Sequence, residues 1–177
     1  MNKPISRISS VASFSVTVFM FLVLAISIIT ANYQKVEDVK VNVQGVTVSK
    51  GGPYDYYDKT SSKADFARVK FDINTDLSKL FNWNTKQLFI YLMVEYDNTK
   101  NVDNKVIIWD RIIKRNGRKK FNLKKTLNKY LFRDFSLSLR DVKDANLTFV
   151  VERIPVMGFF TSRAEYSTKL DFPEIKN

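Results

Sequence analysis

The stretch WNTKQLFIYLMVEY, Trp83 to Tyr96, decides the fold of this chain. From Leu88 to Tyr96 nearly every residue is apolar, so a strand formed here would be apolar on both faces. Such a strand belongs inside a sheet, where it has little contact with water. In the polar turn before it, we expect Asn82 and Asn84 to cap backbone groups rather than to bind a ligand. The core expected around this strand contains Trp83, Leu88, Phe89, Tyr91, Leu92 and Trp109.

The neighbouring segments alternate between apolar and polar residues with the period of two that is typical of half-buried strands. Residues 67–76, ARVKFDINTD, have apolar residues on one face and mostly charged ones on the other. Residues 39–48 alternate as well, but Gln44-Gly45 shifts the phase, as a β-bulge does. Residues 106–113, VIIWDRII, predict a hairpin with the opening strand. Weaker strands are expected at residues 130–132, 147–154 and 164–170.

One segment favours a helix. Leu123, Leu127 and Leu131 recur every four residues, a spacing that places them on one face of a short helix. Many short strands with turns between them, and at most one short helix, predict a mainly β domain. We expect an antiparallel β-sandwich.

The N-terminal region contains a long apolar run. Val11–Ala31 reads VASFSVTVFMFLVLAISIITA, and no charged residue occurs from Ile8 to Gln34. About 20 apolar residues span the hydrocarbon core of a bilayer. A cleaved signal peptide has a shorter apolar region of about 7–15 residues and small residues before the cleavage site, which Ile29-Thr30-Ala31 matches poorly. We therefore expect an uncleaved anchor, with a cytosolic stub at 1–10, a transmembrane helix at 11–31 and the β-sandwich domain at 32–177.

Charges that flank the apolar run predict its orientation. Lys3 and Arg7 precede the run, whereas residues 35–40 hold two lysines and two acidic residues that balance them. The positive-inside rule places the N-terminus in the cytosol and the β domain across the membrane. The hydroxyl side chains within the span are expected to bond their own backbone rather than to mark a contact with another helix. These side chains are Ser13, Ser15, Thr17, Ser27 and Thr30.

The 177 residues include no cysteine and no histidine. Disulfides, thiolate metal sites and a Ser-His-Asp triad are therefore excluded within this chain. Carboxylate chemistry remains possible, but Asp72 with Asp76, and Glu95 with Asp97, lie along single strands and are more typical of surface or turn-capping residues. We expect no catalytic residue, no metal, no cofactor and no small-molecule ligand.

A basic run contributes strongly to the net charge of +11. A solvated face or loop is the simplest interpretation, and an acidic protein partner or lipid headgroups are the alternatives. Nucleic acid is not expected, because the anchor places the domain in a compartment that lacks it. The run has no acidic residue within it and consists of Lys114, Arg115, Arg118, Lys119, Lys120, Lys124, Lys125, Lys129 and Arg133.

Asn146-Leu147-Thr148 is an N-x-T sequon. If the orientation is as predicted, Asn146 lies in a compartment where it can be glycosylated. The pattern places it where a loop meets a strand, which makes it accessible.

Taken together, these residues resemble the subunit 3 family of the eukaryotic signal peptidase complex over nearly the whole chain. The densest match is Trp83–Phe89, followed by Tyr91-Leu92 and Glu95-Tyr96. Residues 50–63 and the basic run match no family pattern. Further matching residues are Ile5-Ser6-Arg7, Phe71-Asp72-Ile73, Asp76-Leu77, Leu80-Phe81, Asn104, Val106 and Trp109-Asp110, and the sequon lies where family members often carry one.

The resemblance implies a single-pass type II protein of the endoplasmic reticulum membrane with a luminal domain. It implies a non-catalytic accessory subunit, which supports the assembly and activity of a separate catalytic subunit in removing signal peptides from secretory and membrane proteins. That catalytic subunit and other membrane subunits of the complex would be its partners. The opening stretch would then be the spine of a rigid scaffold.

Two other interpretations stay open. One is a membrane-anchored luminal module that binds a glycan or a protein and is unrelated to signal peptidase. Affinity of the domain for a ligand, without stable membrane partners, would distinguish it. The other is an enzyme that uses carboxylates alone, which would require two carboxylates facing each other across a cleft.

Overall fold

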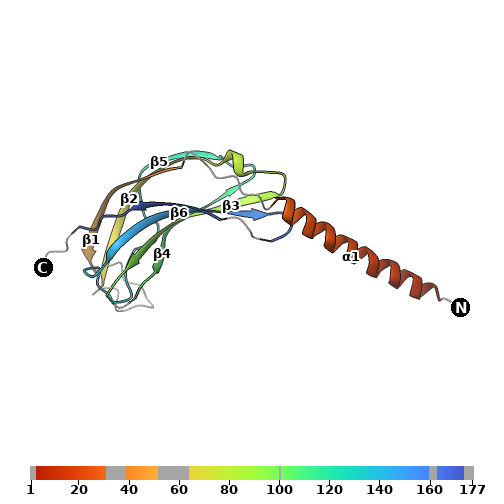
Figure 1. Cartoon of the computed structure of the whole chain (residues 1–177). Coiled ribbons are helices and arrows are strands. Elements are labelled where there is room, and N and C mark those ends of the chain that lie inside the picture. The colour runs from red at the N-terminus through yellow and green to blue at the C-terminus, as the bar shows by residue number, and fades with distance from the viewer. Residues whose placement is uncertain (1–2, 31–38, 52–63, 100, 160–162, 174–177) are drawn as a thin grey trace.

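The computed structural model describes residues 3–30, 39–51, 64–99, 101–159 and 163–173. One helix, α1 (Pro4–Thr30), precedes a domain of antiparallel strands (Figure 1). The fold class predicted from the sequence is therefore confirmed. The strands are β1 (Lys40–Lys50), β2 (Asp65–Asp76), β3 (Thr85–Asp97), β4 (Asn104–Lys114), β5 (Lys120–Leu127), β6 (Lys143–Pro155) and β7 (Arg163–Lys169), with a single 3-10 turn at Ser78–Leu80.

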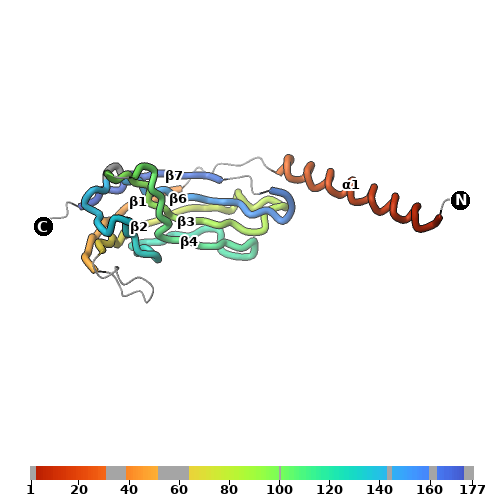
Figure 2. The backbone as a smooth tube through the Cα atoms, turned by 90° about the horizontal axis from the view of Figure 1, so that it is seen from below, coloured from red at the N-terminus to blue at the C-terminus, as the bar shows by residue number. Residues whose placement is uncertain are grey.

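The strands form two sheets. A three-stranded sheet has the order β1-β2-β5 and a four-stranded sheet has the order β4-β3-β6-β7, and all pairings are antiparallel. The strands run along the length of the domain, and α1 extends away from one end of it (Figures 1 and 2). The space between the sheets is the hydrophobic core. No described helix covers the outer face of either sheet.

Strand β3 lies in the interior of its sheet, between β4 and β6. Leu88, Ile90, Leu92 and Val94 alternate along it, point into the core and are fully buried. The next residue on this face, Tyr96, stacks edge-on against Phe132, with ring centroids 5.1 Å apart. The prediction of a strand with little exposure is confirmed, because its outer face is also largely covered.

The prediction that Trp83 is a core residue is wrong, because its side chain is 62% exposed. β3 begins only at Thr85, after a turn in which the Thr85 amide donates to the Asn82 carbonyl at 3.1 Å. The Asn82 side chain closes this turn by accepting from the amide of Asn84 at 3.0 Å and the hydroxyl of Thr85 at 2.9 Å. The turn places Asn84 inside and Trp83 outside.

Register shifts in several strand pairs adjust the sheets. The register of β1 shifts between Val43 and Gly45, where the sequence predicted a change of phase. The register of β4 shifts beside Ile108, whose carbonyl is free to accept from the amides of Lys129 and Tyr130 at 2.8 and 2.9 Å. These bonds tie the segment after β5, in one sheet, to β4 in the other.

The helix predicted around Leu123 and Leu127 is wrong, because these residues belong to strand β5. A spacing of four residues fits two periods of a strand as well as one helical turn. The register slips between the pairs Ile73–Leu123 and Phe71–Thr126, so Leu127 faces outward on the other side of a bulge. Residues 130–132 contribute only an isolated bridge, between Phe132 and Ala67.

Candidate functional site

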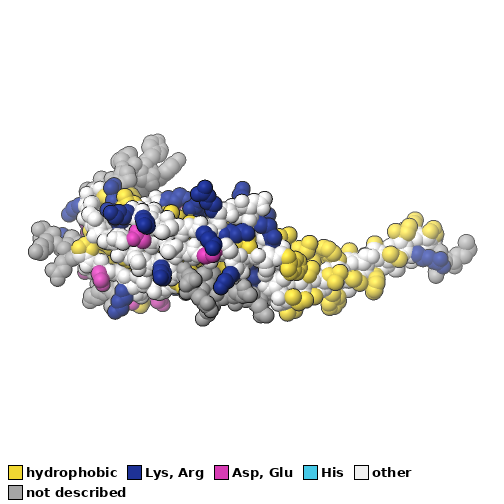
Figure 3. Space-filling view, turned by 90° about the horizontal axis from the view of Figure 1, so that it is seen from above, with side chains coloured by type: hydrophobic (Ala, Val, Ile, Leu, Met, Phe, Trp, Pro, Cys, Tyr) yellow, Lys and Arg dark blue, Asp and Glu magenta, His cyan; other side chains and the backbone are white. Residues whose placement is uncertain are grey.

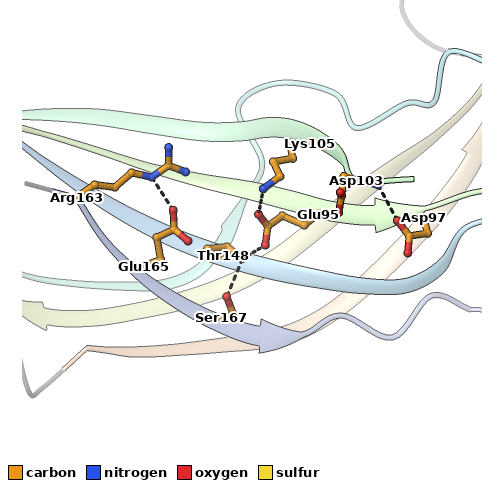
Figure 4. A network of polar contacts seen from close by, with 8 residues as sticks. All are labelled: Glu95, Asp97, Asp103, Lys105, Thr148, Arg163, Glu165 and Ser167. Atoms are coloured by element: carbon orange, nitrogen blue, oxygen red, sulfur yellow. Dashed lines mark hydrogen bonds and ion pairs between the residues drawn. The ribbon is translucent and has the colours of Figure 1, made fainter. Parts of the chain in front are cut away.

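The carboxylates that the sequence offered for catalysis are each bound to separate partners. Glu95 accepts from Lys105 at 2.9 Å and from the Thr148 hydroxyl at 2.8 Å, and Asp97 accepts from the Asp103 amide at 2.8 Å (Figure 4). The hydrogen bond from Lys105 holds the pKa of Glu95 below its usual range. These residues form an ion pair and a turn rather than an acid and a base.

The other carboxylate pair is engaged in the same way. Asp76 accepts from the Ser78 amide and pairs with Lys120 at 2.9 Å. Hydrogen bonds from the Ser78 side chain, from Lys120 and from the Ser78 amide lower its pKa to about 2. Asp72 accepts from the side chain of Gln44 and from the amide of Lys125. Among the described residues there is also no cluster of acidic side chains that could hold a metal ion.

The last turn of α1 is joined to the β domain by polar contacts. Ser27 and Thr30 are buried, unlike most of the helix. The Thr30 hydroxyl accepts from the Asn84 amide group at 2.9 Å, and the Thr30 carbonyl accepts from the Arg153 guanidinium. The Ser27 hydroxyl accepts from the Phe159 amide at 3.2 Å. The end of the helix is therefore hydrogen-bonded to the turn before β3 and to the segment after β6.

Asn84 is the centre of this junction, and its side chain is only 2% exposed. Besides Thr30, its amide group donates to the Met157 carbonyl, while its Oδ1 accepts from the Met157 amide, both at 2.9 Å. The Asn84 carbonyl accepts from Val156 at 2.7 Å. One asparagine thus joins three segments that are distant in the sequence, a role beyond the turn-capping predicted for it.

Gly158 lets the β6–β7 segment approach the helix. Its φ is +94°, and a Cβ at this position would lie 2.6 Å from Ser27 Oγ and 2.7 Å from Ser27 Cβ. Both facts favour glycine. Ser27, Arg153 and Gly158 were not predicted as junction residues. The available signal was the pair of hydroxyl residues at the end of the apolar run.

The hydroxyl residues of α1 mostly bond their own backbone, as predicted. Ser15, Thr17 and Thr30 each donate to the carbonyl four residues before them, at 2.7 to 3.0 Å. Thr30 also accepts from Asn84, so it serves both the helix and the domain.

A second apolar cluster lies on the outer face of β3. Phe89, Tyr91 and Met93 alternate with the core residues and pack with Val150 of β6, and we call these four residues the outer cluster. Directly across the β3–β4 ladder, Ile112 lies opposite Phe89, and Ile107 lies opposite Met93. Opposite residues in an antiparallel pair share a face. Ile107 and Ile112 are 43% and 52% exposed, so the outer cluster is bordered by apolar side chains in contact with solvent.

The predicted core residues therefore fall into separate groups. Leu88 and Leu92 lie in the core between the sheets, and Trp109 joins it with its ring edge-on to Phe71. Phe89 and Tyr91 belong to the outer cluster instead. Burial and a 3.0 Å hydrogen bond from Tyr91 to Glu152 raise the pKa of Tyr91 to about 12.

Comparison with known proteins identifies the family. A model of the signal peptidase subunit family matches residues 1–175. The chain is 34% identical over 158 residues to signal peptidase complex subunit 3 of Gallus gallus, covering 89% of this chain and 86% of the relative. It is 34% identical over 169 residues to signal peptidase complex subunit 3 of Caenorhabditis briggsae, covering 90% and 87%. This chain belongs to the signal peptidase subunit family.

The family resemblance inferred from the sequence is confirmed. The match also extends to a Mus musculus protein named adipocyte-related X-chromosome expressed sequence 1, at 34% identity over 158 residues, with 89% of this chain and 86% of the relative covered. The residues matched by the family model include both α1 and the β domain.

The sequon of this chain lies within a strand rather than at its junction with a loop. Asn146 is in β6 and pairs with Glu95 on one side and Lys169 on the other. Its side chain is half-buried, on the same face as the outer cluster but toward the end of β3 that is distant from α1. Thr148 is fully buried and hydrogen-bonded to Glu95 and Ser167 (Figure 4).

The basic run of this family member covers the β4–β5 turn and strand β5. Two of its lysines are neutralised, Lys120 by Asp76 and Lys129 by Asp110. Hydrogen bonds from Lys129 and Tyr130 also lower the pKa of Asp110. Arg115 binds the carbonyls of the turn before β3. Most of residues 50–63, for which no role was predicted, lie outside the described residues.

Proposed function

We propose that this chain is a non-catalytic accessory subunit of a signal peptidase complex in the endoplasmic reticulum membrane. Helix α1 would anchor it, with residues 1–10 in the cytosol, 11–31 in the membrane and the β-sandwich of residues 32–177 in the lumen. Family membership supports the complex, and the apolar helix of membrane-spanning length supports the anchor. Two charged residues near the N-terminus, Lys3 and Arg7, support the orientation.

The residue types of the chain support a non-catalytic role. Without histidine or cysteine it holds neither a Ser-His-Asp triad nor a thiol nucleophile. Its candidate carboxylates are occupied by cations or backbone amides. In this proposal a separate catalytic subunit supplies the reacting groups, and this chain supports the assembly and activity of the complex.

The observation that carries the proposal is the outer cluster. A β-sandwich normally presents polar residues on its outer faces. Here the outer face of β3 is apolar, and Ile107 and Ile112 extend the apolar surface into solvent. Exposed apolar surface of this kind, rimmed by polar groups such as the Glu95–Lys105 pair, is typical of a protein contact. We infer that another subunit of the complex packs here.

The junction supports an anchor that stays attached. Cleavage after the apolar run would remove the partners of Asn84, Arg153 and Phe159 in the last turn of α1. Two of these, Asn84 and Arg153, are buried polar side chains, and each hydrogen bond that such a side chain loses destabilises the fold.

The test changes the apolar border without touching the core. Replacing Ile107 and Ile112 together by serine should reduce the amount of catalytic subunit recovered with the tagged chain in mild detergent. Leu127→Ser is the matched control, because Leu127 is an aliphatic strand residue of similar exposure, 48%, on the other sheet. Equal recovery from both variants, at normal levels of the tagged chain, would show that the outer cluster is not the contact.

A further inference from the structure

The end of the β domain next to α1 is formed by residues 77–87, 114–120 and 156–159, which we call the basal rim. It is fixed to the helix at two points, from Asn84 to Thr30 and from Phe159 to Ser27. In both views α1 extends directly away from this end (Figures 1 and 2). The basal rim therefore lies at the level of the last helical turn.

That level corresponds to the edge of a bilayer. Uncharged sequence begins at Ile8, and at 1.5 Å per residue Ser27 and Thr30 lie about 30 Å further along the helix. The hydrocarbon core of a bilayer is also about 30 Å thick. If α1 spans the membrane, the basal rim reaches the interface between acyl chains and headgroups.

The basal rim exposes large apolar side chains at this level. Trp83 and Phe159 are 62% and 66% exposed, and Val156 and Met157 are also exposed. The outward position of Trp83 is built into the fold, because Arg115 binds the Trp83 carbonyl at 2.8 Å and the Thr85 carbonyl at 3.1 Å. These bonds hold the turn in the form that buries Asn84 and leaves the indole outside.

The charge of the basal rim is entirely positive. Residues 77–87 contribute two lysines and residues 114–120 contribute five Lys or Arg, whereas none of the three segments contains Asp or Glu. Of these seven cationic side chains, Lys120 pairs with Asp76, which lies just outside the rim. Lys and Arg side chains gather on the face shown in Figure 3 up to the base of the apolar helix. Lys119 also lies over the Phe81 ring, 4.8 Å from its centroid.

We propose that the basal rim rests in the bilayer interface, with Trp83, Met157 and Phe159 at the boundary of the acyl chains and the basic side chains on lipid phosphates. Tryptophan is enriched in this layer, and Lys and Arg next to it bind headgroup phosphates. The contact assigns a role to the part of the basic run nearest the helix. The contact also sets the strands across the membrane plane rather than along it. The outer cluster then faces subunits that lie beside this chain in the complex. This inference rests on α1 spanning the membrane, as proposed above.

The experiment measures Trp83 fluorescence in the full chain reconstituted into phosphatidylcholine vesicles. The chain has two tryptophans, and Trp109 is buried, so the difference between wild type and Trp83→Phe isolates Trp83. Lipids brominated near the headgroup end of the acyl chains should quench the Trp83 component about twofold, with little quenching by aqueous acrylamide. The double variant Lys86→Glu, Arg118→Glu should increase the quenching of Trp83 by acrylamide and decrease its quenching by brominated lipid, because anionic side chains repel lipid phosphates.

A matched control places a tryptophan at the opposite end of the domain. Phe135 is 98% exposed and lies beside Leu137, which binds the start of β2, far from α1. In a Trp83→Phe, Phe135→Trp chain, acrylamide should quench and brominated lipid should not. Trp83 quenched only by acrylamide would overturn the proposal, and Trp83 shielded from both quenchers would overturn it in favour of a protein contact. Release of the chain from the vesicles by alkaline extraction would show that α1 does not span the bilayer. That result would contradict the membrane anchor on which both proposals depend.

Discussion

The side-chain amide of Asn84 donates a 2.9 Å hydrogen bond to the hydroxyl of Thr30, and this bond joins the β-sandwich to the end of its helix. The two residues are 54 positions apart in the sequence. Asn84 simultaneously holds both the amide and the carbonyl of Met157. Because the junction is buried and fully bonded, the domain is held in a fixed orientation relative to α1.

Replacing Asn84 by alanine should loosen that orientation. The change leaves the Met157 amide without its partner, which costs about 1–3 kcal/mol for a buried group. Since the chain has no cysteine of its own, spin labels attach only to introduced cysteines, here Ser13→Cys on α1 and Arg68→Cys on β2. The distance distribution between them should broaden in the variant. Asn122→Ala, at an exposed asparagine of β5, should leave it unchanged, and an unchanged distribution in Asn84→Ala would contradict this account of the junction.

Gly158→Ala should also disturb the junction, for steric reasons. The new Cβ would lie 2.7 Å from Ser27 Cβ, and alanine is strained at a φ of +94°. A loss of more than about 1 kcal/mol in the free energy of unfolding is expected, measured by denaturant in detergent micelles. Gly45→Ala is the control, because nothing lies within 4 Å of its Cβ position. Adding Ser27→Gly should recover part of the loss, since it removes the clashing Cβ.

Asp134 should make stability depend on pH. It is buried, and although burial acts to raise its pKa, hydrogen bonds from Ser136, Tyr96 and Asn98 hold that pKa below its usual range. The stabilisation is therefore present above the unfolded-state pKa of about 3.9 and is lost as pH falls through the lower folded-state pKa.

Asp134→Asn should accordingly be less stable than wild type at pH 7, by about 1.5–3 kcal/mol, as expected for hydrogen bonds to a charged group. This difference should shrink in acid. Urea unfolding between neutral pH and about pH 3 measures it. Asp141→Asn, at an exposed position, serves as the control. A difference that stays constant with pH would show that the Asp134 charge is not what stabilises the fold.

Glycosylation of Asn146, which remains a prediction, should take place before β6 is paired. Thr148, the third residue of the sequon, is fully buried in the folded domain and bonded to Glu95. Chain synthesised in the presence of microsomes should therefore migrate more slowly on a denaturing gel. Endoglycosidase treatment or Asn146→Gln should restore the faster migration. Folded chain added to microsomes afterwards should stay unmodified. A modified Asn146 would also place the domain in the lumen, because the N-glycosylation machinery acts there.

The strands were predictable from the sequence because their apolar residues alternate. Phe71 and Ile73 on β2, and the phase change at Gly45 in β1, gave elements that the structure reproduces. The apolar helix was predictable from its length. β5 was not, because a leucine spacing of four residues suits both a strand and a helix, and its bulge is fixed only by pairing with β2.

The junction could not be predicted because its contacts join distant segments. Trp83 and Asn84 are neighbours, and composition alone favours burying the tryptophan. The structure buries the asparagine because Thr30 and Met157 satisfy its polar atoms there. The sequence showed that both faces of β3 are apolar. Which of its residues enter the core and which form the outer cluster depends on the register of β3 with β4 and β6.

The central claim, that this chain is an accessory subunit of a signal peptidase complex, is tested most directly by purifying the tagged chain in mild detergent and identifying its partners by mass spectrometry. The account predicts a catalytic signal peptidase subunit in fixed ratio to this chain. A monodisperse anchored chain recovered alone would contradict the account and favour a separate membrane-anchored binding module.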